Sequence, residues 1–419
     1  MATRAASHTG RLLLASTLAL FTAGLAASLR AGAAADWQRD FFDPVDPAHS
    51  AEMTGAALGA AFLGFALTVA AGSLLADAAA AAFLLAASGG CVVAGTLVTM
   101  YADSISSGAG VYHVLYAGSL VTGIGWGLAE VARRDTRHVW WPGGLMAGGL
   151  LAYVLGKAGV GWQAELGLAV IPAVAVAVLG LASKASPVER EASIVPMGQR
   201  FRDLLHPLAL ILLLAACVTA VGEFAPGQWI DLALTRPVQM RGVLLLACAG
   251  GIMLAGRRYA ARWARRIPPI ILAWCSCMLA SLGLVTLGLA GTPVAGALGA
   301  TLWGAGICFL WPAMRAAARE RFPRGGALLA GWMQAAGALT VWLVLPAMGR
   351  ALDGAKSEAA ANAAVAAAAA GAASFRSVAY LPAILLVVFG ALWVWSTSTT
   401  ARSSQADRPS QAGGTPPSQ

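Results

Sequence analysis

The sequence predicts an all-α membrane protein, with twelve transmembrane helices arranged as two six-helix bundles. Three observations predict this fold class. The chain of 419 residues is 58% hydrophobic and only 11% charged, whereas a soluble domain carries roughly 25% charged residues. Apolar stretches recur, and they match the length of about 20 residues with which a helix crosses roughly 30 Å of hydrocarbon. Lysine and arginine gather in every second connection between these stretches, as they do in cytoplasmic loops.

The apolar stretches give the predicted helices in chain order. Few of them hold an ionisable residue in their interior, as expected when a charge at the bilayer centre costs about 2.5–3.5 kcal/mol. Small residues at four-residue spacing, such as Gly144 and Gly148, predict close contacts between helices. The predicted spans are residues 11–33, 52–75, 78–101, 110–131, 139–157, 163–183, 205–225, 238–256, 268–290, 293–314, 325–349 and 376–397.

The distribution of positive charge predicts the orientation of the chain. With the N-terminus placed in the cytoplasm, the cytoplasmic segments hold 20 of the 28 lysines and arginines, which places both termini there. Attraction of these loops to anionic lipid explains the net charge of +9, so no nucleic acid is expected as a partner. A cleaved signal peptide is an alternative interpretation, because Arg4 and Arg11 precede an apolar run. That run exceeds the usual length of about 7–15 residues, which favours a retained helix.

A long basic loop divides the chain into two halves. We expect an N-terminal six-helix bundle over residues 1–183, a cytoplasmic linker over 184–204 and a C-terminal six-helix bundle over 205–397. Residues 398–419 are rich in Ser, Thr, Gln, Pro and Gly, which predicts a disordered cytoplasmic tail. In both halves a basic loop after the fourth helix leads into a glycine-rich helix start. Parallel repeats of six helices are typical of one large class of secondary transporters.

Several short pieces of the sequence carry a resemblance to a known family. They are Phe41-Phe42-Asp43 through His49-Ser50-Ala51-Glu52-Met53, Leu63-Gly64-Phe65-Ala66, His138-Val139-Trp140-Trp141-Pro142-Gly143-Gly144, Ala225-Pro226-Gly227-Gln228-Trp229, Phe309-Leu310-Trp311-Pro312 and Glu320-Arg321-Phe322-Pro323. From roughly residue 12 to 397 the chain resembles a bacterial branch of the major facilitator superfamily (MFS), similar to the fucose–proton symporter and sugar transporter group. The resemblance implies symport of a sugar or a similar small polar solute.

The chain departs from that family in three places. The family has a signature motif in the loop between the second and third spans. This chain retains Leu75, Ala76 and Asp77 of that motif but has alanines where the family carries basic residues. Asp77 is a gating candidate, since an acid at a helix start contributes about 0.3–1 kcal/mol; the alternative is a hydrated acid at a helix end. About a dozen residues of the relatives are missing after Glu130, and the first helix lacks the acid of the symporter group.

Polar and aromatic side chains inside the spans are the candidate solute-binding residues, because transporter sites lie near the middle of the bilayer. Gln334 is the only glutamine well inside a span, so it either bonds a neighbouring helix or faces a wet cavity. Trp126, Trp303 and Trp311 present aromatic faces to a solute. Pro312 predicts a kink that would let its helix bend as a gate.

A second group of candidates lies around Pro226 at the end of the seventh predicted span. A proline and a glycine there predict a broken helix, whose freed backbone groups face a cavity. Glu223, Gln228 and Trp229 are therefore predicted to form an outer gate or to reach the solute. The alternative is an outside loop in which the carboxylate of Glu223 is hydrated.

Two acids are candidates for proton coupling, Glu130 and Glu223, because acids in membrane helices mark proton relays. For Glu130 the alternative is a salt bridge with Arg133 or Arg134 at the inner membrane edge. Trp141 begins a helix on the same side, which favours a place in the interfacial aromatic belt.

The sequence shows no nucleotide-binding motif, catalytic triad or metal-ligand spacing, so we expect no enzyme, cofactor or metal site. It predicts a monomeric, multi-pass transporter of the bacterial inner membrane that moves a small solute by alternating access, with protons as the candidate coupling ion. We expect a neutral solute, since no charge is visible at mid-depth. Two alternatives stay open: an exporter of hydrophobic compounds, and a non-transporting sensor or scaffold derived from a transporter.

Overall fold

The computed structural model describes residues 2–75, 80–132, 140–183, 202, 204–264, 266–322, 326–358 and 363–406. Over these residues every regular element is a helix, which confirms the predicted all-α membrane fold. Eleven helical segments are long and apolar enough to cross a membrane. The remaining predicted span corresponds to α6 (Trp140–Lys157), which is 18 residues long and packs against α1 of its own half and α11 of the other half.

The N-terminal half begins with α1 (Ala2–Trp37), which continues into a single π-helical turn. In this half α7 and α8 together form one span. The elements of this half are α1, η1 (Gln38–Phe42), α2 (Ser50–Leu75), α3 (Ala81–Met100), α4 (Ala102–Ile105), α5 (Gly110–Ala132), α6, α7 (Trp162–Gly167) and α8 (Val170–Leu181).

The C-terminal half repeats the same plan of six spans. Its last helix, with 44 residues, is the longest that the structure describes, and four helices of this half contain an internal proline. The helices of this half are α10 (Pro207–Val238), α11 (Gly242–Ala264), α12 (Pro269–Leu289), α13 (Pro293–Arg321), α14 (Gly326–Glu358) and α15 (Ala363–Ala406).

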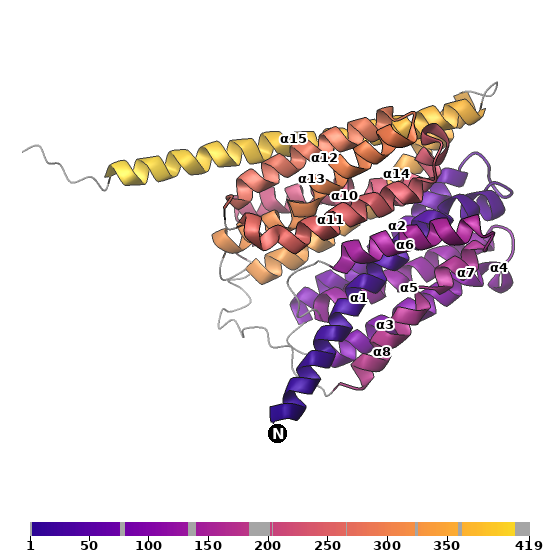
Figure 1. Cartoon of the computed structure of the whole chain (residues 1–419), viewed down its shortest axis with the longest axis horizontal. Coiled ribbons are helices and arrows are strands. Elements are labelled where there is room, and N and C mark those ends of the chain that lie inside the picture. The colour runs from indigo at the N-terminus through magenta and orange to yellow at the C-terminus, as the bar shows by residue number, and fades with distance from the viewer. Residues whose placement is uncertain are drawn as a thin grey trace, which may run out of the picture.

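The helices run between two sides of the molecule. We call the side on which α8 ends and α10 begins the linker side, and the opposite side the far side. The start of α1 and the end of α15 both lie on the linker side, where α15 extends beyond the other helices (Figure 1). An even number of spans has this consequence, because each span carries the chain across once.

Helix packing divides the described residues into two bundles. In the first half α1 packs on α6, α2 on α5, and α3 on α5 and α8; in the second half α12 packs on α13 and α15, and α10 on α14 and α15. The halves meet along three helix pairs, α2 with α14, α6 with α11, and α1 with α10. The two bundles therefore face one another along these three helix pairs (Figure 1).

Small residues allow α6 to approach α1 closely, as the spacing of Gly144 and Gly148 predicts. A Cβ atom on Gly144 would collide with the carbonyl oxygen of Phe21. A Cβ atom on Gly148 would lie 2.7 Å from the carbonyl oxygen of Leu25. Glycine thus replaces side-chain contacts with backbone contacts between the two helices.

The predicted break in the seventh span is wrong. Helix α10 continues through Pro226 to Val238. Proline removes one helical donor, and the carbonyl four residues earlier, that of Gly222, loses its partner. The indole N–H of Trp303 donates to this carbonyl oxygen at 3.0 Å, so the helix continues with its freed acceptor satisfied.

Two predicted segments fall mainly outside the described residues. Of the linker, only residues 202 and 204 are described. Helix α15 runs to Ala406, past residue 398 at which the sequence predicts the start of a disordered tail, and residues 407–419 lie outside the description.

Candidate functional site

A cavity lies between the two halves, bounded by α1, α2, α5 and α6 on one side and by α10, α11, α13 and α14 on the other. The cavity has a volume of about 110 Å³. One water needs roughly 10–15 Å³ of such volume, so there is room for several waters or one small solute. Trp141 at the start of α6 and Glu130 near the end of α5 belong to its wall. The cavity therefore reaches the linker side.

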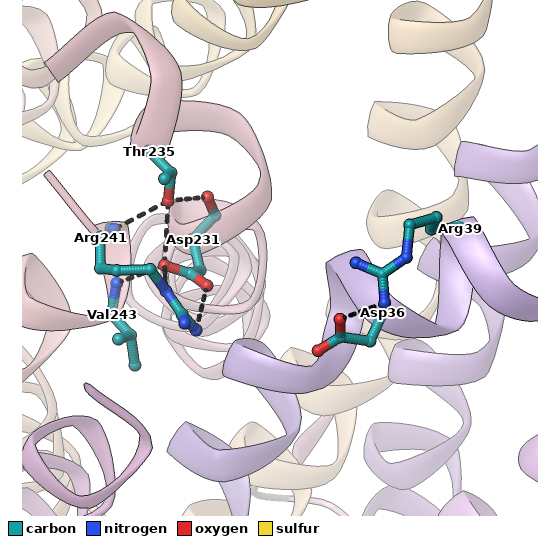
Figure 2. Close-up of polar contacts among 7 residues, drawn as sticks. Asp36, Arg39, Asp231, Thr235, Arg241 and Val243 are labelled. Atoms are coloured by element: carbon teal, nitrogen blue, oxygen red, sulfur yellow. Dashed lines mark hydrogen bonds and ion pairs between the residues drawn. The ribbon is translucent and has the colours of Figure 1, made fainter. Parts of the chain in front are cut away.

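The turn between α10 and α11 fixes how these two helices lie along one another. Asp231 accepts hydrogen bonds from the guanidinium of Arg241 and from the backbone N–H of Val243, both at 2.9 Å. Thr235 donates to the same carboxylate at 3.0 Å and accepts from the backbone N–H of Gly242 at 2.9 Å. Figure 2 shows the carboxylate of Asp231 at the centre of this network, with Asp36 and Arg39 of the first half nearby.

This turn places Glu223 opposite Arg257. Residues 223 to 238 and residues 242 to 257 each span 15 positions, so both side chains lie about 22 Å from the turn at the helical rise. Arg257 Nη2 and Glu223 Oε1 form an ion pair at 3.3 Å, with only 5% and 3% of the two side chains exposed. Both residues belong to the cavity wall. Each charge at this depth is held by the other, because neither is hydrated by bulk water.

Arg257 also satisfies a backbone acceptor on α13. Pro312 removes the helical donor of the Cys308 carbonyl, four residues earlier, and Arg257 Nε donates to that oxygen at 3.1 Å. Helix α13 continues through Pro312, and Pro312 itself lines the cavity. The sequence points to Pro312 but misses Arg257, which it places in a cytoplasmic loop.

The expectation that no charge lies at mid-depth is therefore wrong. Arg257 and Glu223 are buried in the cavity wall, and Arg315 on α13 lines the cavity one turn beyond Trp311. Arg30, which the charge count assigns to the outer end of the first predicted span, is also buried within α1, where it donates to the carbonyl oxygen of Ala57 at 3.2 Å. The predicted spans 238–256 and 293–314 end one residue before Arg257 and Arg315, so hydropathy alone does not show these two residues inside the membrane.

Four aromatic side chains in the cavity wall contact one another in a closed ring. We call Phe62, Trp126, Trp141 and Phe224 the aromatic ring. The centroid distances are 6.3 Å for Phe62–Trp126, 6.1 Å for Trp126–Trp141, 6.0 Å for Trp141–Phe224 and 5.8 Å for Phe224–Phe62. Trp126 was a candidate from the sequence, whereas Trp141 was expected in the interfacial belt. That expectation is wrong, because Trp141 faces the cavity.

Three other candidates from the sequence lie in the same wall. Gln334 on α14, Glu130 on α5 and Trp311 on α13 all line the cavity, so the structure brings them together with Glu223 and Trp126. Asp77 lies outside the described residues. Within the described part of the chain, no three His, Cys, Asp or Glu side chains are grouped so that they could hold a metal ion.

The remaining candidates lie behind this cavity. Trp303 and Gln228 line a smaller cavity of about 20 Å³, which shares Glu223, Phe224 and Trp141 with the main cavity. Trp229 is buried, with 2% of its surface exposed, and lines neither cavity. Glu223, Gln228 and Trp229 are all buried within α10, which excludes the alternative of an outside loop with a hydrated carboxylate, and of the three only Glu223 lines the main cavity.

On the far side, residues of α14 hold the start of α2. The carboxylate of Asp353 accepts hydrogen bonds from the backbone N–H groups of Ala51 at 3.1 Å and Glu52 at 2.9 Å. Arg350 forms an ion pair with Glu52 at 2.7 Å. An acid from one half thus caps a helix N-terminus of the other half, and the far side is closed at this helix pair.

No family model matches the sequence, and no curated protein sequence matches it. Solved structures do match. A D-xylose–proton symporter has a TM-score of 0.71 at 15% identity, over 90% of this chain and 97% of that chain. The nucleoside transporter NupG has a TM-score of 0.68 at 12% identity, over 91% and 99% of the two chains. The MFS proton:xylose symporter XylE has a TM-score of 0.64 at 14% identity, over 91% and 95%.

Proposed function

We propose that this chain, which has the fold of major facilitator superfamily transporters, is a secondary transporter that moves a small solute across a membrane by alternating access. The resemblance predicted from the sequence is confirmed for the fold. The observation that carries the proposal is the cavity between the halves, whose wall takes side chains from four helices of each half. Movement of one half against the other would open this cavity to one side at a time.

The contacts between the halves support a cycle of two states. The cavity reaches the linker side, while Asp353 and Arg350 hold α14 on α2 at the far side. In the proposed cycle these far-side contacts break when the cavity opens to the far side. The Arg350–Glu52 pair is partly exposed, whereas Asp353 and Ala51 are buried, so opening of the far side also has to separate the packed faces of α2 and α14.

Glu223 is the proposed coupling acid. It pairs with Arg257 in the cavity wall, and its second oxygen, Oε2, has no hydrogen-bond partner among the described residues. A proton on Glu223 would cancel its charge and release Arg257, whereas a bound solute anion would compete for the same guanidinium. Glu130 at the cavity mouth is the proposed residue for proton exchange with the linker side, where its alternative partners Arg133 and Arg134 lie outside the described residues.

We propose the bacterial inner membrane as the location, with the linker side in the cytoplasm and the protein as a monomer. The excess of lysine and arginine in the linker-side segments supports this orientation. Reporter fusions at the two termini test it, since both should report the cytoplasm. One fusion in the cytoplasm and the other outside would contradict it.

An exporter of hydrophobic compounds is the second candidate. The aromatic ring, together with Phe65 and Trp311, makes much of the cavity wall apolar. The Glu223–Arg257 ion pair and Arg315 in the same wall favour a polar solute instead, because polar groups of a solute can bond to charged side chains that an apolar compound would only desolvate.

Transport by the purified full chain in liposomes tests the proposal. Labelled sugars, nucleosides, amino acids and betaines are offered with and without a proton gradient across the liposome membrane. We expect at least one solute to accumulate only with the gradient, and Glu223→Gln to abolish accumulation while exchange of solute persists. Equal accumulation of a solute with and without the proton gradient would contradict proton coupling. A chain that moves no member of the panel, but retains a partner protein on purification, would favour the sensor alternative.

A further inference from the structure

Three of the four neighbouring pairs in the aromatic ring meet nearly at right angles, as the walls of a box do. The neighbouring ring planes meet at 78° for Phe62–Trp126, 84° for Trp126–Trp141 and 88° for Trp141–Phe224, and at 49° for Phe224–Phe62. If centroids about 6 Å apart lie at the corners of a square, the centre is about 4 Å from each ring, within the roughly 6 Å reach of a cation–π contact. All four side chains line the cavity.

Such a box suits a cation without N–H groups better than a sugar. Aromatic faces attract positive charge through their quadrupole and recognise alkylated ammonium groups. They offer no acceptor for the hydroxyl groups of a sugar, each of which costs free energy when it is buried without a partner. The box therefore discriminates by charge and shape rather than by hydrogen bonds.

The charged residues of the wall are divided between the two halves. Glu130 lies one turn from Trp126 on α5 of the N-terminal half, while Arg257 and Arg315 come from α11 and α13 of the C-terminal half. Glu223 precedes Phe224 in the sequence and pairs with Arg257. A lone cation would meet two guanidinium groups across the cavity. A solute with a positive head and a negative end would meet complementary charge at both of its ends, with the head near Glu130 and the negative end near Arg257 and Arg315.

We infer that the cavity binds a small zwitterion. Its alkylated ammonium head lies between the four side chains of the aromatic ring, and its carboxylate points toward Arg257 and Arg315. This inference rests on the proposed transport function, because it names the solute class of the same cavity. It replaces the neutral solute that the sequence favours.

Binding to the purified full chain in detergent tests the inference through an isosteric pair. Glycine betaine has a positively charged nitrogen at the centre of its head group, and 3,3-dimethylbutanoate has a neutral carbon at the same position. Choline keeps the charged nitrogen but lacks the carboxylate. We expect glycine betaine to bind at least about tenfold more tightly than either analogue, as measured by titration calorimetry. Equal affinity for betaine and the carbon isostere would overturn the ammonium site, and equal affinity for betaine and choline would overturn the carboxylate site.

Substitutions in the aromatic ring, compared with a control substitution elsewhere, distinguish a loss of solute recognition from a general loss of folding. Trp126→Leu and Phe62→Leu should each remove the preference for betaine over its carbon isostere, and Trp126→Phe should keep it because an aromatic face remains. Trp274→Leu is the matched control, since Trp274 lies on the outer surface of α12 with 38% of its area exposed. A preference that survives both ring substitutions overturns the inference. Uptake of a sugar without any binding of betaine would refute this solute class and leave the transporter proposal intact.

Discussion

Arg257 on α11 donates a hydrogen bond to the carbonyl oxygen of Cys308 on α13, at 3.1 Å. Pro312 leaves this oxygen without a helical donor, and the same guanidinium pairs with Glu223 on α10 at 3.3 Å. One side chain thus joins three helices in the cavity wall. The position of Arg257 is set by the α10–α11 turn, so Asp231 and Arg241 at the far side contribute to the geometry of a site about 22 Å away.

The first prediction concerns this buried pair. Arg257→Met leaves Glu223 as an uncompensated buried charge and should lower the free energy of unfolding by about 3–5 kcal/mol. The double variant with Glu223→Leu should lose less than Arg257→Met alone, because no charge is left buried. Thermal unfolding in detergent measures both. Additive losses in the double variant would show that the two side chains do not interact.

The second prediction distinguishes two tryptophans. Trp303→Phe removes the donor to the Gly222 carbonyl and leaves this buried acceptor unsatisfied, at a cost of about 1–3 kcal/mol. Trp311→Phe should cost much less, because Nε1 of Trp311 has no hydrogen-bond partner among the described residues. Melting temperatures of the two variants give the comparison. A larger loss for Trp311→Phe would contradict the structural role of Trp303.

The third prediction concerns closure of the far side. A short bismaleimide that joins cysteines introduced at Glu52 and Arg350 should hold α2 on α14 and stop solute uptake into liposomes. Either single-cysteine variant treated with the same reagent should keep transport. The native cysteines lie within the helices, and the unmodified chain provides the control for their reaction. Full transport by the cross-linked protein would exclude this helix pair as a moving contact.

The fourth prediction concerns pH at the far-side loop. Asp46 Oδ2 lies 2.9 Å from His49 Nδ1; this hydrogen bond raises the pKa of His49 above its ordinary value and lowers that of Asp46. The contact is therefore complete between the two pKa values. It is lost as pH rises through the raised pKa of His49, and also as pH falls through the lowered pKa of Asp46.

An NMR titration of histidine-labelled protein measures this shift. We expect Asp46→Asn to return the pKa of His49 toward the usual value of about 6.5. An unchanged pKa for His49 in this variant would contradict the contact.

The sequence predicts the fold well because hydropathy and loop charge report directly on a membrane. It also finds Gln334, Trp126, Trp311 and Glu223, which line the cavity. These residues are recognisable because polar and aromatic groups stand out against an apolar helix.

The sequence fails where an interaction between helices decides the outcome. Pro226 breaks no helix because Trp303, 77 positions later, satisfies the carbonyl that it frees. Arg257 reads as a loop residue because Arg258 follows it and a basic cluster ends the helix, and only its partner Glu223 on another helix shows that it is buried. Phe62, Trp141 and Phe224 each look like ordinary membrane residues until the fold brings them to Trp126.

The Arg350–Glu52 pair, with 56% and 30% of the two side chains exposed, is open to dissolved ions, whereas the Arg257–Glu223 pair is not. Screening acts over about 8 Å at physiological ionic strength and reaches only the first of these pairs. A saltier medium on the far side would therefore ease separation of α2 from α14 and leave the cavity wall unchanged. In the proposed transport cycle, the salt concentration on the far side would in this way change how often the cavity opens to that side.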